Sequence, residues 1–172
     1  MNLIRLLEDR ADEIIKEANR ALMSWRLTHY QKAGEDKCKR RLKTLYHFIS
    51  KSIKKCSSTS LILYVQNITR ERFNSGYDIQ EVQIAFNILE EAIWKKVLEE
   101  VDNMTPVELG KVLGTISTVC GTGKDTLADT YVMLSGKTGT PSLDIEALFK
   151  GTDCVLISDC EEKSEQEHGI ES

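Results

Sequence analysis

Apolar residues recur at steps of three and four along most of the chain, and this spacing predicts helices. The first predicted helix ends near Gly34, because glycine is favoured just past a helix end. A second helix is predicted from about Asp36 to Lys55. The apolar face of the first is Ile4, Leu7, Ala11, Ile14, Ile15, Ala18, Leu22 and Trp25, and that of the second is Cys38, Leu42, Leu45, Ile49 and Ile53.

The run LILYV at residues 61–65 is consistent with a strand or a helix, because short apolar runs are ambiguous. Serine and threonine caps precede it, and the apolar spacing continues to Ile68. We therefore expect a third helix, closed by Gly76.

Two further helix starts carry capping signals. Asp78 with Glu81 three residues later predicts a capping box before a fourth helix, from Ile79 to about Asp102. The second signal is at residues 105–108, where Thr105 is the cap, Pro106 the first helical position and Glu108 the third. This pattern predicts that a fifth helix starts at Pro106.

The fourth helix is apolar on more than one face. Ile84, Ile88 and Trp94 widen its main stripe, so it is expected to be buried on two sides. Two interpretations stay open: the helix lies deep in the core, or these three residues form a dimer interface.

The stretch VCGTGKDT at residues 119–126 resembles a phosphate-binding loop, but the apolar phase passes through it unbroken. The P-loop pattern requires a glycine where Thr118 stands, and Asp125 follows the lysine, where it would repel a phosphate. We predict that Gly121 and Gly123 lie in the fifth helix, where another helix crosses closely.

The segment GKTGT at residues 136–140 lacks the aspartate that P-type ATPases phosphorylate, since Gly136 stands in its place. It lies in a predicted linker, 136–142, between a domain at 1–135 and a C-terminal segment at 143–172. That segment is expected to be an acidic, partly disordered arm.

We define residues 152–172 as the acidic segment. It holds seven acids and one lysine, a charge of −6. Because the whole chain carries −4, the remaining residues sum to +2.

Five scattered cysteines favour reduced thiols and a cytoplasmic location. No apolar run approaches the roughly 20 residues that span a bilayer, so no membrane association is expected. The sequence shows no Ser/His/Asp order and no paired catalytic carboxylates, so no enzymatic activity and no cofactor are predicted.

The chain has three histidines that could act as ligands. His29 extends the apolar spacing of the first helix, and we interpret it as a last-turn histidine near free carbonyls, with haem or small-ligand binding as the alternative. His47 is expected on the surface and His168 in solvent. Cys154, Cys160 and His168 match no common zinc spacing, so no metal site is predicted.

The second predicted helix is strongly basic. Its cations include Lys39, Arg40, Lys43 and Lys51. A solvated face is the plainer interpretation, and an anion surface that binds nucleic acid, an acidic partner or the chain's own acidic segment is the alternative. Because aromatic residues are few and the body is only slightly positive, nucleic acid is not expected.

Trp25 and the stretch ITRERFNSGYDIQEVQIAFNILEEAIWKKV at residues 68–97 resemble the RsbRD N-terminal domain of RsbT co-antagonists, the RsbR-type proteins of bacterial stress signalling. The family's arginine, glycine and acid-bearing cap fall on Arg70 or Arg72, Gly76, Asp78 and Glu81. The resemblance covers about residues 3–135.

This resemblance implies an all-α, globin-like bundle of about five to seven helices that dimerises without haem. It implies a sensory module for an output protein of a stress or two-component pathway. In that family an output domain follows, whereas only about 37 residues follow residue 135 here. Two interpretations stay open: a free-standing sensor or adaptor, or a domain cut from a longer chain.

Overall fold

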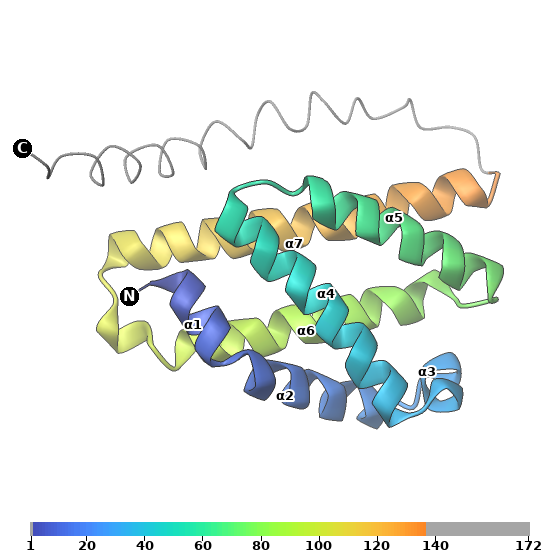
Figure 1. Ribbon diagram of the computed structural model, residues 1–172, viewed down its shortest axis with the longest axis horizontal. Coiled ribbons are helices and arrows are strands. Elements are labelled where there is room, and N and C mark those ends of the chain that lie inside the picture. The colour runs from blue at the N-terminus through green and yellow to red at the C-terminus, as the bar shows by residue number, and fades with distance from the viewer. Residues whose placement is uncertain (1, 137–172) are drawn as a thin grey trace, which may run out of the picture.

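The computed structural model describes residues 2–136, and in this range the chain is all-helical, without a strand. Figure 1 shows the order of the elements along the chain. The helices are α1 (Leu3–Asp9), α2 (Ala11–Ser24), α3 (Thr28–Ala33), α4 (Glu35–Lys55), α5 (Thr59–Asn74), α6 (Ile79–Leu98) and α7 (Pro106–Leu134), with a 3₁₀ turn η1 (Val101–Asn103). The expected all-α bundle is confirmed. The linker beyond Gly136 and the segment 143–172 lie outside the described residues.

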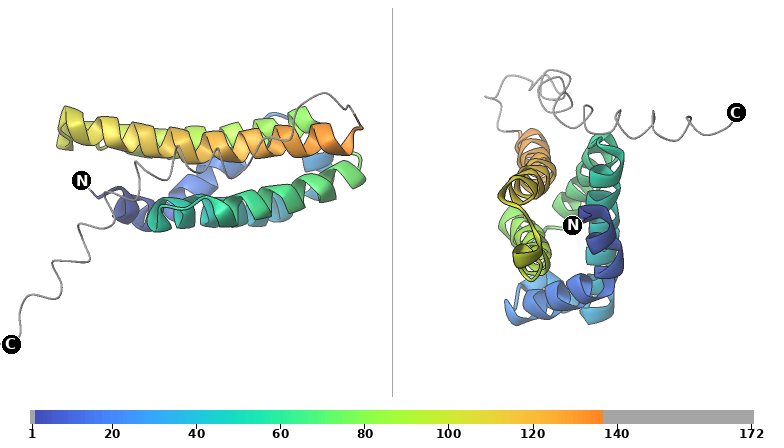
Figure 2. Two further views of the ribbon diagram at one scale, coloured as in Figure 1. Left: turned by 90° about the horizontal axis from the view of Figure 1, so that it is seen from above. Right: turned by 90° about the vertical axis from the view of Figure 1, so that its left-hand side faces the viewer.

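The long helices form two layers. Figure 2 shows α6 and α7 on one side and α4 and α5 on the other, with α2 along one edge. α5 packs against α7 and α4, while α2 packs against both α6 and α4. One continuous core therefore lies between the layers.

The predicted apolar stripes line this core. Ile14 of α2, Ile49 of α4, Leu61 of α5, Ile93 of α6 and Ile116 of α7 are all fully buried. The stripe predicted for α4 is confirmed at every position, because Cys38, Leu42, Leu45, Ile49 and Ile53 are all buried.

The single first helix predicted over residues 4–33 is wrong, because the chain bends twice there. The first break is at Arg10, and the second follows α2, where Arg26 adopts a left-handed φ of 54°. Trp25, expected on the apolar face, is 58% exposed. The separate α3 packs back against α4 and α2, so tertiary packing ends the helix although the apolar spacing continues.

The predicted helix starts are mostly correct. The Thr105 and Glu108 side chains form the reciprocal capping box, with Pro106 at the first helical position. Asp78 caps α6 by accepting a hydrogen bond from the Gln80 N–H. Glu81, however, does not complete a box with Asp78, because its carboxylate is bound to His29. α6 ends at Leu98, and the η1 turn occupies residues near the predicted end.

The glycine-containing stretch lies inside α7, as predicted, so the backbone has no loop that could surround a phosphate. Gly123 is buried against the ring of Phe86 on α6, whereas no side chain or other helix lies close to Gly121.

Cys38 and Cys120 are buried free thiols, but Cys56 is disulfide-bonded, which the expectation of reduced thiols did not include. No helix within residues 2–136 has the length and apolarity needed to cross a membrane.

Candidate functional site

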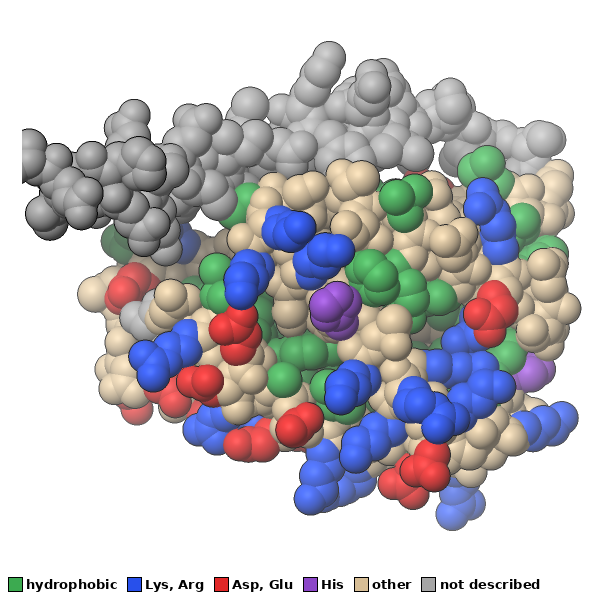
Figure 3. Space-filling view, viewed as in Figure 1, with side chains coloured by type: hydrophobic (Ala, Val, Ile, Leu, Met, Phe, Trp, Pro, Cys, Tyr) green, Lys and Arg blue, Asp and Glu red, His purple; other side chains and the backbone are tan. Residues whose placement is uncertain are grey.

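The amphipathic pattern of α4 places its cations on the outside of the bundle. Its apolar stripe is held in the core, so the opposite positions Lys39, Arg40 and Lys43 are exposed. Residues three and four apart share a face of a helix, so these three side chains form one patch, here called the basic face. The space-filling view shows Lys and Arg side chains gathered over α4 (Figure 3).

The charges of the basic face are not neutralised by the rest of the described chain. No ion pair joins Lys39, Arg40 or Lys43 to a carboxylate within residues 2–136. Other lysines of this range do pair, as Lys54 does with Glu8 at 2.8 Å and Lys124 with Glu90 at 2.6 Å. The basic face is therefore a free positive surface on a rigid helix.

Lys51, predicted to belong to the same surface, has a different environment. It is half-buried, and its Nζ lies 5.9 Å from the centroid of the Phe48 ring. Phe48 in turn stacks on Tyr64 of α5 at 4.4 Å between centroids. Lys51 thus covers the seam between α4 and α5, and it extends the basic face only at its edge.

Beside the basic face, side chains from three helices meet around Tyr77, which lies between α5 and α6; we call this group the Tyr77 cluster. The His29 ring stacks on Tyr77 at 4.5 Å, and Tyr30 meets it edge-on at 5.6 Å. Arg41 donates a hydrogen bond from Nη1 to the Tyr77 hydroxyl at 2.9 Å. The guanidinium of Arg72 lies 5.3 Å from the same ring. α3, α4, α5 and the start of α6 are joined at this point.

The sequence predicts that His29 lies in a last helical turn, near free carbonyls, and this prediction is wrong. His29 lies in the first turn of α3, and its Nδ1 is 2.9 Å from Oε2 of Glu81 on α6. This contact ties α3 to α6 across 52 residues of sequence. The haem interpretation gains no support from this geometry, because the ring is held between a carboxylate and the stacked Tyr77.

Arg72 is the most deeply buried cation of the Tyr77 cluster. Its side chain is 7% exposed and is paired with the neighbouring Glu71. Burial also raises the pKa of Tyr30 to about 12, so this phenol stays neutral near pH 7. A buried guanidinium is retained only with a charge partner or several polar contacts, so the arrangement indicates a structural role.

The residues that carry the family resemblance lie at the same end of the bundle. Gly76 has a φ of 75°, a left-handed conformation that favours glycine, and it ends the turn after α5. Asp78 and Glu81 follow as cap and as partner of His29. Arg70 is exposed, so Arg72 is the arginine that packs inside. The resemblance is therefore made of residues that build this end of the bundle.

The three residues proposed for a dimer interface are largely used inside one chain. Ile88 is 6% exposed and belongs to the core, and Ile84 and Trp94 are partly buried against it. The apolar excess of α6 is explained by packing against both α2 and α7. Exposed apolar side chains lie elsewhere, including Leu63 on α5 and Val107, Leu113 and Met133 on α7.

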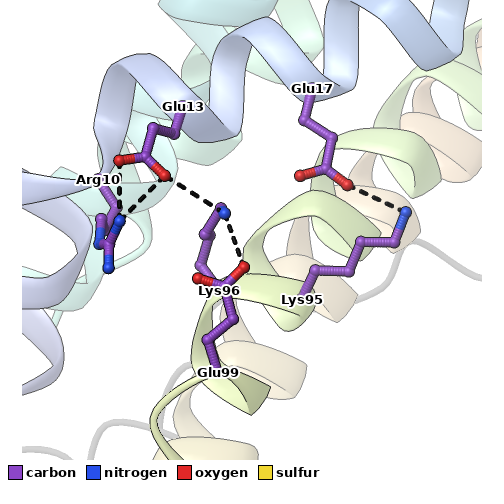
Figure 4. A network of polar contacts seen from close by, with 6 residues as sticks. All are labelled: Arg10, Glu13, Glu17, Lys95, Lys96 and Glu99. Atoms are coloured by element: carbon purple, nitrogen blue, oxygen red, sulfur yellow. Dashed lines mark hydrogen bonds and ion pairs between the residues drawn. The ribbon is translucent and has the colours of Figure 1, made fainter.

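A polar network between α2 and α6, shown in Figure 4, was not foreseen from the sequence. Arg10 and Lys96 both bind the Glu13 carboxylate, and Lys96 also pairs with Glu99. Lys95 pairs with Glu17 at 3.1 Å, beside a groove of about 620 Å³ along α2. Because these ion pairs are mostly exposed and mutually satisfied, their role is to orient α2 on α6.

Within the described part of the chain, no three His, Cys, Asp or Glu side chains are grouped as metal ligands would be. The sequence candidates Cys154, Cys160 and His168 lie outside it. His47, predicted on the surface, is exposed.

Comparison with known protein families, curated proteins and solved structures found no match to this chain.

Proposed function

We propose that this chain is a non-catalytic regulatory module that binds an acidic protein partner through the basic face of α4. The main support for this proposal is that Lys39, Arg40 and Lys43 are exposed and have no carboxylate partner within residues 2–136. Charges of one sign on a fixed helix steer an oppositely charged surface and select its orientation. The Tyr77 cluster supports this role by fixing the adjacent part of α4 through Arg41.

An acidic protein is favoured over nucleic acid for two reasons. Outside the acidic segment the chain sums to only +2, whereas nucleic-acid binding typically uses a strongly basic surface with many Lys and Arg contacts to phosphates. In addition, binding to single strands uses exposed aromatic faces on which bases stack. Here Phe48 and Tyr64, the aromatic residues near Lys51, stack on each other.

A signalling role in a bacterial stress or two-component pathway, a cytoplasmic location and a homodimeric state complete the proposal. Their support is the resemblance at residues 68–97, together with the exposed apolar residues of α7 for self-association. Native mass spectrometry tests the last point. A dimer without added mass agrees with the proposal, and a species carrying a haem mass contradicts it.

The binding proposal is tested by fluorescence anisotropy with a fluorescein-labelled decaglutamate peptide. We expect Arg40→Glu/Lys43→Glu to weaken binding at least tenfold, and binding to weaken steeply with salt. The matched control is Lys16→Glu/Arg20→Glu, which reverses two exposed cations on α2 with nearly the same spacing. A labelled deca-thymidine strand forms the second arm, and tighter binding of this strand would favour the nucleic-acid alternative.

A further inference from the structure

The three cations of the basic face lie close together on one helix. Like charges three or four residues apart on a helix repel each other. Some other lysines of the described chain are paired with carboxylates, as Lys95 is with Glu17 and Lys96 with Glu13 and Glu99. A surface of this kind is stabilised by any anionic group brought to it.

The same chain supplies a suitable polyanion. The acidic segment carries seven of the 27 Asp and Glu residues and one lysine, and four of its glutamates lie within seven positions, at 161, 162, 165 and 167. Without this segment the chain sums to +2. The charge of the molecule is thus divided between a positive body and a negative segment.

The connecting sequence is long enough to bring the two together. Twenty-five residue steps separate Gly136, the last described residue, from Glu161, and at ~3.4 Å each they span up to roughly 85 Å. α4, with its 21 residues, is only about 30 Å long. A tethered segment of this kind has an effective concentration on the order of millimolar near its own body.

We propose that the acidic segment, residues 152–172, occupies the basic face of α4 in the same molecule and competes there with the acidic partner. This inference rests on the proposed function for the partner, but the intramolecular contact stands without it. The segment acts as a built-in competitor: it lowers the apparent affinity of the face for weakly acidic proteins. Only a partner with a higher negative charge density displaces it.

The competition is measured on the full-length chain with the decaglutamate probe. In one variant the four clustered glutamates are made neutral: Glu161→Gln, Glu162→Gln, Glu165→Gln and Glu167→Gln. We expect this variant to bind the probe about tenfold more tightly than the natural chain. This factor applies when the effective concentration of the segment is about ten times its dissociation constant for the basic face. The control exchanges Asp12, Asp102 and Asp125, which are exposed acids of the described bundle that form no ion pair with α4, for their amides.

The outcomes separate the two proposals. If neutralisation leaves probe affinity unchanged while Arg40→Glu/Lys43→Glu still weakens it, the inference is overturned and the proposed function stands. If Arg40→Glu/Lys43→Glu has no effect even in the neutralised variant, the basic face is not the binding surface and both are overturned.

A second measurement detects the contact without any probe. A carbodiimide joins a carboxylate to a lysine Nζ as an amide, with loss of water, only when the two are in contact. We expect cross-linked peptides between Lys39 or Lys43 and residues 161–167, in protein of monomeric mass and independent of protein concentration. Cross-links found only in dimeric protein would show that the segment binds a second copy and would overturn the intramolecular proposal.

Discussion

Gly123 of α7 faces the ring of Phe86 on α6 so closely that a Cβ at residue 123 would overlap Cζ of Phe86. Because Phe86 is 2% exposed, its ring is confined by the surrounding core. We expect Gly123→Ala to lower the free energy of unfolding by about 1–3 kcal/mol through overpacking. Urea denaturation followed by circular dichroism measures this change.

Gly121→Ala is the matched control, because a Cβ there meets no atom within 4 Å. Alanine favours the helix over glycine, so this variant is expected to gain up to about 1 kcal/mol. Phe86→Leu should recover part of the loss when it is combined with Gly123→Ala. Equal stability of the two alanine variants would contradict the proposed contact.

The His29–Glu81 pair is expected to stabilise the attachment of α3 to α6. Its two side chains are 30% and 14% exposed, compared with 61% and 56% for the surface pair Lys54–Glu8. A double-mutant cycle with alanine at both positions should give a coupling energy of about 1 kcal/mol. The same cycle on Lys54–Glu8 should give about 0–0.5 kcal/mol, and equal couplings would argue against a special role for His29.

The capping box before α7 makes stability depend on pH in the acid range. The hydrogen bond from the Thr105 backbone N–H, with that from its hydroxyl, lowers the pKa of Glu108 from 4.5 to about 2. A carboxyl group whose pKa is lower in the folded state stabilises fully above its unfolded pKa. Its contribution is then lost as the pH falls from about 4.5 towards 2. Glu108→Gln should therefore melt below the natural chain at pH 7 and approach it near pH 2.

Thr105→Ala tests the other half of the same box. Removal of a threonine cap costs about 1 kcal/mol, and the loss should persist at low pH in part, because the hydroxyl bond to the Glu108 backbone N–H does not titrate. If the melting temperatures of both variants kept a constant offset from the natural chain between pH 7 and pH 2, the proposed role of the Glu108 carboxylate would be wrong.

Ile88→Glu distinguishes burial in the core from an interface between subunits. Because Ile88 is 6% exposed in a single chain, an unpaired carboxylate there should cost several kcal/mol and unfold the protein. Leu113→Glu, at a 40% exposed site on α7, should change stability by no more than about 0.5 kcal/mol. A folded monomer of Ile88→Glu would instead assign the residue to a dimer interface.

The parts of this fold that could be predicted from the sequence are those set by neighbours along the chain. The stripe of α4, the continuous course of α7 through its glycines and the Thr105 capping box all depend on contacts within a few residues. The breaks around α2 could not be predicted, because Trp25 continues the apolar spacing, whereas the chain turns to place α3 against α4.

The candidate site divides in the same way. The basic face follows from helix periodicity, since Lys39, Arg40 and Lys43 lie opposite a stripe that the sequence already shows. The Tyr77 cluster does not, because most of its contacts join distant residues: Arg41 and Tyr77 are 36 positions apart, and His29 and Glu81 are 52. A hydrophobic pattern contains no information about which distant polar side chains meet, so the sequence predicts only a local capping role for Glu81.

Arg41 lies between the exposed residues of the basic face, and its guanidinium is held by the Tyr77 hydroxyl. That anchor restrains the backbone of α4 at the place where Arg40 and Lys43 project from it. A partner that arrives there therefore meets a surface with little backbone freedom left to lose, and the entropy lost on binding is confined mainly to the lysine and arginine side chains.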